Sequence, residues 1–243
     1  MTAYLAQARA ETFMTLRRGE TLLLTVGIPV VFLVFFSTVH VISTGTTEAV
    51  TFILPGILAL AVMSTAMVSL GIATGFERGY GVLKRLGSTP LGRPRLLGAK
   101  ITMILVVEAI QAAVLLPVGG ALGWRPVGSA GSWAAALGLI LLATVGFGGI
   151  GLLMAGLLRA EVNLAAANGL YLVFLLLGGM IVPVAKLPEA LGALARALPP
   201  AALSSGLHAA LGSGVAVPAE SWIVLGIWAL AAPLAAALTF RWE

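Results

Sequence analysis

The sequence contains no cysteine and no aspartate, so all of its acidic residues are glutamates. Without cysteine the chain can form no disulfide bond, thiolate metal site or cysteine nucleophile. Without aspartate it lacks the Walker B residue that holds magnesium in ATPases, and it has no Gly-Lys pair to complete a P-loop. We therefore expect a chain that is not an enzyme and that binds no cofactor or metal of its own.

Charge is also scarce, because only 9% of the 243 residues are charged whereas 60% are hydrophobic. Soluble domains have roughly 25% charged and roughly 45–50% apolar residues. The apolar excess comes in long blocks, which favours a single transmembrane domain over residues 1–243. The net charge of +5 fits the Lys and Arg excess on the cytoplasmic side of membrane proteins, so we expect no nucleic acid partner.

Six apolar stretches are each long enough to cross a bilayer, which takes about 20 residues in a helix. They cover Thr21–Val41, Val50–Phe76, Ile101–Gly123, Trp133–Leu158, Val162–Val184 and Ser221–Phe240. Lipid cannot satisfy an open backbone, so each stretch must be helical. The sequence therefore predicts an all-α integral membrane fold with six transmembrane helices.

The positions of Lys and Arg predict the orientation of these spans. With the N-terminus in the cytoplasm, 11 of the 14 Lys and Arg residues fall on the inner side. The outer side then holds Arg125, Lys186 and Arg196. This asymmetry over short loops is the positive-inside pattern. We therefore expect a multi-pass protein of the plasma membrane, in contact with lipid, with both termini in the cytoplasm.

Residues 1–20 precede the first span and are predicted to form an interfacial helix. The side chains of Leu5, Ala8, Thr12 and Leu16 fall on one face of that helix. Basic residues border and follow this face, which suits a helix lying on the inner membrane surface.

Residues 185–220 form a long external connection that is still rich in Ala and Leu. Within it, residues 187–198 and 201–211 predict two short helices, with Pro199-Pro200 between them. Apolar helices of this length cannot span a bilayer, so we expect a re-entrant or interfacial hairpin before the last span.

Residues 77–100 form the only sizeable cytoplasmic loop. It begins at Glu77 with Glu-Arg-Gly-Tyr-Gly-Val-Leu-Lys-Arg-Leu-Gly-Ser-Thr-Pro-Leu, and a short amphipathic helix fits Tyr80–Leu86. Thr89-Pro90 would end that helix, since the residue before proline avoids the helical region. From charge alone, a solvated basic loop that only fixes topology explains these residues equally well.

Two motifs lie on opposite sides of the predicted membrane. The first is the Glu-Arg-x-x-Gly-x-Leu-Lys-Arg-Leu-x-x-Thr-Pro-Leu sequence of residues 77–91, and the second comprises Gly178–Pro183, Leu187-Pro188 and Leu203–Leu207 after the fifth span. Together they resemble the ABC type-2 permeases, the membrane halves of a class of ATP-binding-cassette exporters. Within that family the chain is most similar to the daunorubicin-type drug-efflux permeases.

The resemblance implies a partner and a set of contact residues. The loop after the second span would be a coupling helix in a groove of a cytoplasmic ATP-binding-cassette ATPase, which would bind ATP and Mg²⁺. Its contact residues would be Glu77, Arg78, Gly81, Lys84, Arg85 and Leu86, and Arg159 and Glu161 would make a second, smaller contact. Six helices are half of the usual twelve, so a second permease copy, identical or paralogous, would complete a dimer.

With this resemblance, the apolar composition predicts efflux of a hydrophobic or amphipathic compound, drug-like or lipid-like, as in multidrug export and antibiotic resistance. An ion-coupled secondary transporter is the alternative, but such proteins generally need several intramembrane acids. Here Glu108 is the one acid well inside a span. Glu108 and Gln111 either line the substrate path or pair with neighbouring helices, and the sequence leaves both roles open.

One glycine motif invites a different interpretation. Gly146–Gly151 matches the dinucleotide-binding pattern Gly-x-Gly-x-x-Gly. That function requires a strand before the motif and a helix after it, whereas these residues lie inside a predicted span. Close helix packing by small residues is the better interpretation, and it applies to Gly71 and Gly75 as well.

Overall fold

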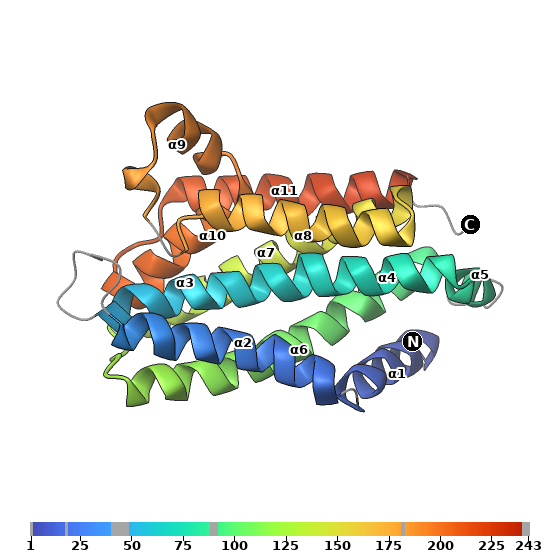
Figure 1. Ribbon diagram of the computed structural model, residues 1–243, viewed down its shortest axis with the longest axis horizontal. Helices are drawn as coiled ribbons and strands as arrows, with labels where there is room; N and C mark the ends of the chain where they lie inside the picture. The colour runs from blue at the N-terminus through green and yellow to red at the C-terminus, as the bar shows by residue number, and fades with distance from the viewer. Residues whose placement is uncertain (1, 18, 40–48, 88–91, 181–182, 240–243) are drawn as a thin grey trace.

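The computed structural model describes residues 2–17, 19–39, 49–87, 92–180 and 183–239, and every regular element within these ranges is a helix (Figure 1). The elements, in chain order, are α1 (Thr2–Arg17), α2 (Gly19–Thr38), α3 (Ala49–Met63), the π-helical segment η1 (Ser64–Ser69), α4 (Leu70–Gly79), α5 (Val82–Gly87), α6 (Arg93–Ala121), α7 (Ala130–Leu157), α8 (Ala160–Leu177), the 3₁₀ turn η2 (Val184–Lys186), α9 (Glu189–Arg196), α10 (Pro199–Leu207), the π-helical segment η3 (His208–Ser213) and α11 (Ala219–Thr239). The all-α prediction is confirmed for this part of the chain.

Five helices within the described ranges are long and apolar enough to cross a membrane. They are Ala49–Gly79, Arg95–Ala121, Ala130–Leu157, Ala160–Leu177 and Ala219–Thr239. The chain is therefore a multi-pass membrane protein. The first expected span, residues 21–41, extends past Val39 to residues outside the described ranges, and the apolar part of α2 is the shorter stretch Leu23–Thr38.

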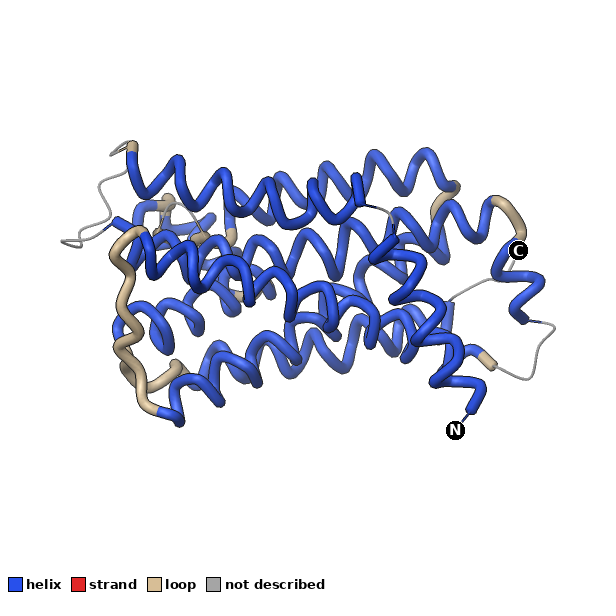
Figure 2. Tube along the Cα trace, turned by 90° about the horizontal axis from the view of Figure 1, so that it is seen from below, coloured by secondary structure: helices blue, strands red, loops and turns tan. Residues whose placement is uncertain are grey.

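The long helices run lengthwise in one bundle (Figures 1 and 2). The segments α3, η1 and α4 form one continuous helix of 31 residues, most of which is buried between the other helices. Its central position explains its composition, because a helix that is apolar on all sides needs partners on all sides. Around it, α2, α6, α7 and α8 each make contacts, and α11 packs along α7.

Glycines bring α4, η1 and α7 into close contact. A Cβ atom on Gly71 would lie 3.0 Å from the Cα of Gly151, and one on Gly151 would lie 2.5 Å from the carbonyl oxygen of Met67. On the other side of α7, a Cβ atom on Gly149 would lie 2.5 Å from the backbone nitrogen of Pro233 in α11. The Gly-x-Gly-x-x-Gly motif lies inside a helix, and its interpretation as a packing motif is confirmed.

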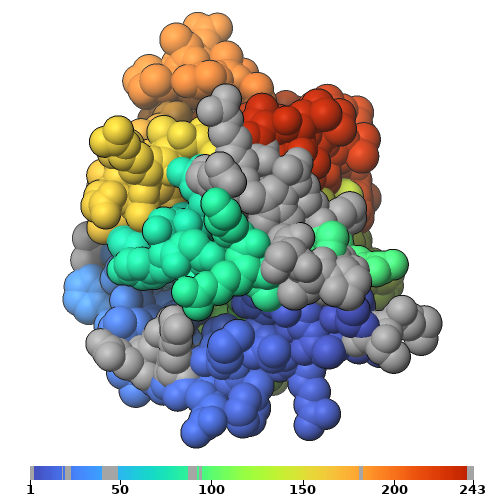
Figure 3. All heavy atoms as spheres, turned by 90° about the vertical axis from the view of Figure 1, so that its right-hand side faces the viewer, coloured from blue at the N-terminus to red at the C-terminus, as the bar shows by residue number. Residues whose placement is uncertain are grey.

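The two ends of the bundle carry different elements. The helices α1 and α5 and the last turn of α11 lie at one end, and α9 and α10 lie at the other (Figure 1). Figure 3 looks onto the first end, where the teal atoms of α4 and α5 lie above the blue atoms of α1. The segments expected to share one side of the membrane therefore share one end of the bundle.

The connection between α8 and α11 contains two short helices, close to the predicted ranges. Most of α9 is exposed and stands off the bundle (Figure 3), whereas all of α10 except Ser205 is buried against α3, α7 and α11. Pro199 and Pro200 do not separate the two helices but begin α10. Proline is favoured in a first helical turn because the backbone N–H that it lacks has no partner there.

Candidate functional site

The end of the central helix places the first residues of the signature motif. The helix α4 continues to Gly79, so Glu77 and Arg78 lie in its last turn and not in a loop. Tyr80 ends α4 and Gly81 turns the chain into α5 with a φ of 70°. Only glycine adopts this left-handed backbone conformation without steric cost, so Gly81 fixes the angle between α4 and α5.

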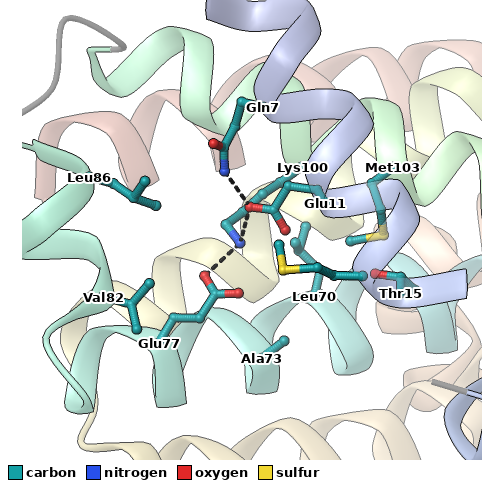
Figure 4. A pocket seen from close by; sticks show the side chains of 11 residues that line it. Gln7, Glu11, Thr15, Leu70, Ala73, Glu77, Val82, Leu86, Lys100 and Met103 are labelled. Carbon is teal, nitrogen blue, oxygen red and sulfur yellow. Dashed lines mark hydrogen bonds and ion pairs between the residues drawn. The ribbon is translucent and has the colours of Figure 1, made fainter. Parts of the chain in front are cut away.

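A buried charged cluster joins α4 to α1 and α6 (Figure 4). The Nζ atom of Lys100 lies 2.6 Å from Oε2 of Glu77 and 3.2 Å from Oε1 of Glu11. Gln7 donates a hydrogen bond of 2.9 Å to the same oxygen of Glu11. The side chain of Lys100 is only 1% exposed, so its charge needs these two carboxylates. We call Gln7, Glu11, Glu77 and Lys100 the three-helix joint.

The three-helix joint opens into a cavity of about 360 Å³. Its lining comprises Gln7, Glu11, Met14, Thr15, Leu70, Ala73, Glu77, Val82, Leu86, Lys100 and Met103 (Figure 4). The cavity lies beside the ion pairs and reaches from α1 to α5. Its wall is therefore built from helices that are distant from one another in the sequence.

The short helix α5 is anchored by its own small apolar cluster. Leu83 in α5 and Leu96 in α6 are fully buried, and Ala3 of α1 and Leu86 of α5 pack against them. The other face of α5 is exposed and carries Lys84 and Arg85. Next to it, Tyr80 is 75% exposed and its ring stacks on Phe76. One face of α5 therefore packs against the bundle, and the opposite face is exposed and basic.

Arg78 links α4 to the end of α7. Its guanidinium donates hydrogen bonds to the carbonyl oxygens of Gly156 and Leu158, the second at 2.6 Å. The last carbonyls of a helix have no partner within the helix and carry partial negative charge, so they favour a cation. Arg78 therefore points into the protein, as Glu77 does.

The expected second contact lies beside the first. Arg159 precedes α8 and Glu161 lies in its first turn, and both side chains are exposed. The start of α8 is attached to α4, because Asn163 donates a hydrogen bond of 2.8 Å to the carbonyl oxygen of Gly71. The structure thus brings the two predicted contact segments to the same end of the bundle.

Glu108 and Gln111 lie one turn apart on α6 and join it to different neighbours. Thr144 of α7 donates a hydrogen bond of 2.6 Å to Glu108, and Gln111 donates one of 3.0 Å to Thr65 of η1. Gln111 also donates to the carbonyl oxygen of Thr25 at 2.9 Å. That carbonyl is four residues before Pro29, which has no N–H to offer it. These contacts support the helix-pairing alternative for both residues.

A second cavity, of about 340 Å³, lies between α2, η1 and α8. Its polar lining residues are Thr25, Ser64, Asn168 and Tyr171, and the others are apolar. The neighbouring faces of α2 and α8 are exposed and apolar, with Leu23 and Leu176 each 72% exposed. This cavity therefore combines a few polar groups with a mostly apolar wall.

Three members of the three-helix joint, Gln7, Glu11 and Lys100, were not predicted from the sequence as site residues. Lys100 counted only as one of the positive charges on the inner side. A signal was nevertheless present, because a lysine that begins an apolar run needs an acid nearby when it is buried. The pairing itself joins positions that are distant along the chain.

The family model described as ABC-2 type transporter matches residues 3–211 of the chain. This range contains all of α1 except Thr2, together with α4, α5 and the first residues of α6, and therefore the whole three-helix joint. Among curated proteins, none matches the sequence.

Proposed function

The chain belongs to the ABC-2 type transporter family, and from this we propose that it is the membrane subunit of an ATP-driven exporter. Proteins of this family are transmembrane components that normally partner with a cytoplasmic ATP-binding-cassette ATPase. In this proposal ATP and Mg²⁺ bind to that ATPase, and its closure on ATP moves α5. The cargo is a hydrophobic or amphipathic compound, as in the daunorubicin-type efflux permeases.

The proposed topology has six spans, with α2 as the first. The end of the bundle that carries α1 and α5 faces the cytoplasm, and α9 and α10 face outward. The asymmetry of Lys and Arg along the chain supports this orientation. On α1 the apolar side chains of Leu5, Phe13 and Met14 are exposed while Ala8 and Glu11 face the bundle, which suits a helix lying in the inner interface.

The observation that carries the proposal is the attachment of α5. In our account its exposed face, with Lys84 and Arg85, binds the ATPase, and Gly81 and Leu86 lie beside that contact. Oriented charges at an interface select the partner and its register. Arg159 and Glu161 add the second contact from the neighbouring end of α8.

Glu77 and Arg78 have a different part in this account. Because both side chains bind within the protein, we do not place them in the contact with the ATPase. They instead transmit the movement of α5 to other helices. Glu77 passes it through Lys100 to α6 and α1, and Arg78 passes it to the end of α7. A displacement of a small rigid helix is thereby carried to three other helices as a rigid-body movement.

The proposed export path runs between two copies of the chain. The cavity between α2, η1 and α8 lies on an apolar face of the bundle, and we place it on the surface that meets the second copy. Its mostly apolar wall with hydroxyl and amide groups suits an amphipathic cargo. Pro29 and the π-helical segment η1 both line this cavity. Single π-helical turns are frequent at functional sites, which supports a role for this cavity in transport.

The proposal is tested by reconstituting the chain in liposomes with its ATPase. We expect efflux of an amphipathic dye that requires ATP and that continues when ionophores collapse all ion gradients. Efflux that stops when the ion gradients are collapsed and that does not depend on ATP would instead indicate an ion-coupled secondary transporter.

A further inference from the structure

A third cavity, of about 270 Å³, lies at the end of the bundle opposite α5. It is bounded by η2, α9, α10 and the start of α11, which meet at the left of Figure 1, and it is open to solvent on one side. Its lining comprises Val184, Ala185, Arg196, Ala201, Ala202, Ser205, Pro218, Glu220 and Ser221. The cavity shares no lining residue with the three-helix joint or with the cavity beside η1.

Two opposite charges line this cavity without pairing. Arg196 ends α9 and Glu220 lies in the first turn of α11, and both side chains are exposed. Within the part of the chain that the structure describes, neither side chain takes part in a hydrogen bond or an ion pair. The cavity therefore offers one cationic and one anionic group with a net charge of zero.

Two hydroxyl groups add to the polar lining. Ser221 is only 2% exposed, and its hydroxyl makes no hydrogen bond with a described residue. Its oxygen is not sealed from solvent, so it can bond a ligand or water in the cavity. Ser205 is the one exposed residue of α10, and it lines the same cavity.

The chemistry of these groups defines the ligand. The planar guanidinium of Arg196 matches the two oxygens of a phosphate or carboxylate. The Glu220 carboxylate accepts hydrogen bonds, which a primary ammonium group donates and a quaternary one cannot. The remaining wall, with Val184, Ala201, Ala202 and Pro218, is apolar and adjoins the membrane-spanning α11.

We propose that this cavity binds a zwitterion that carries a primary ammonium group and a phosphate group, as in the headgroup of phosphatidylethanolamine. Arg196 holds the phosphate, Glu220 holds the ammonium group, and the serine hydroxyls complete the phosphate contacts. The apolar wall accommodates the start of a lipid tail when the zwitterion belongs to a lipid.

Native mass spectrometry of the purified full chain in detergent tests this site. Wild type is titrated with phosphatidylethanolamine, phosphatidylcholine and phosphatidylglycerol, and phosphoethanolamine is added as a soluble competitor. The test variants are Arg196→Gln and Glu220→Gln. The matched controls are Arg125→Gln and Glu189→Gln, which change exposed residues of the same types outside the cavity.

We expect wild type to prefer phosphatidylethanolamine over the other two lipids. Each test variant should bind it about tenfold more weakly, as the loss of one hydrogen bond to a charged group predicts. Both controls should bind it as wild type does. Displacement by phosphoethanolamine would identify the soluble zwitterion as a sufficient ligand, and failure of displacement would identify the intact lipid.

Equal binding of phosphatidylethanolamine by wild type, test variants and controls would overturn the proposal. So would equal binding of the three lipids by wild type. Circular dichroism of each variant ensures that a folded protein is compared in every case.

Discussion

The ammonium group of Lys100 lies 2.6 Å from the carboxylate of Glu77, although Lys100 begins the apolar part of α6 and Glu77 lies in the last turn of the central helix. Glu11 of α1 shares the same ammonium group at 3.2 Å. A single buried charge thus holds three helices at the point where the central helix turns into α5. The pair is the first step in the transmission that we propose from α5 to the bundle.

Removal of the Lys100 charge should destabilise the protein. In Lys100→Met the carboxylate of Glu11 remains buried without a cation, which costs about 3–5 kcal/mol in comparable cases. For a chain of this size we expect the thermal midpoint in detergent to fall by at least about 6 °C. Lys84→Met is the matched control, because Lys84 is exposed at the same end of the bundle.

Glu11→Gln distinguishes this cause from a simple packing effect. In the double variant Lys100→Met with Glu11→Gln the buried unpaired carboxylate is gone, so part of the lost stability should return. A thermal midpoint for the double variant as low as the sum of both single effects would contradict the ion-pair explanation.

Gly81→Ala should strain the turn between α4 and α5. The φ of 70° costs a residue with a side chain about 1 kcal/mol or more, so the thermal midpoint should fall by about 2–4 °C. Gly79→Ala is the control, because Gly79 is helical and its added Cβ would meet Ala160 at an ordinary distance of 3.7 Å. An equal fall of the thermal midpoint in both variants would contradict this explanation, because of the two glycines only Gly81 has a positive φ.

The proposed topology predicts a labelling pattern. The chain has no native cysteine, so Ser88→Cys, Ala130→Cys and Glu243→Cys can each be labelled alone. In intact cells an impermeant maleimide should label position 130 and should leave positions 88 and 243 unlabelled until the membrane is opened. Labelling at position 88 from outside would reverse the orientation that we propose.

The purified chain alone should hydrolyse no ATP, since its sequence contains neither a P-loop nor an aspartate. Hydrolysis should appear when the separate ATPase subunit is added. The phosphate release of the chain, the ATPase and their mixture gives the comparison. Hydrolysis by the isolated chain that persists after repurification would show that a nucleotide site exists in it.

Much of the fold follows from hydropathy, because the apolar runs correspond to α3–α4, α6, α7, α8 and α11. The boundaries are less predictable where charges occur. The helix α6 begins at Arg93, eight residues before the expected start at Ile101, because helical hydrogen bonding continues through a charged segment that hydropathy excludes. For the same reason Glu77 and Arg78 belong to α4 and not to a loop.

The candidate site was predicted only in part. The motif of residues 77–91 identifies the position of α5, but it does not say which side chains face the bundle. That depends on Lys100 and on the free carbonyls of Gly156 and Leu158, and such long-range partners leave no local pattern. Likewise, the expected apolar face of α1 is divided, because Ala8 packs inward while Leu5 and Leu16 are exposed.

The central claim is that α5 carries the movement of the ATPase into the bundle through Glu77. The most direct test is the amount of substrate exported per ATP hydrolysed in proteoliposomes that contain the permease and its ATPase. Arg85→Ala tests the exposed contact face and Glu77→Ala tests the transmission. Arg125→Ala and Glu189→Ala, both at the opposite end, serve as controls.

We expect the controls to keep the wild-type ratio. In Arg85→Ala binding of the ATPase should weaken about tenfold, as the loss of a desolvated charge contact predicts. In Glu77→Ala the ATPase should still bind and hydrolyse ATP, but export per ATP should fall by about tenfold or more. A Glu77→Ala protein that inserts normally and exports the wild-type amount of substrate per ATP would contradict the account.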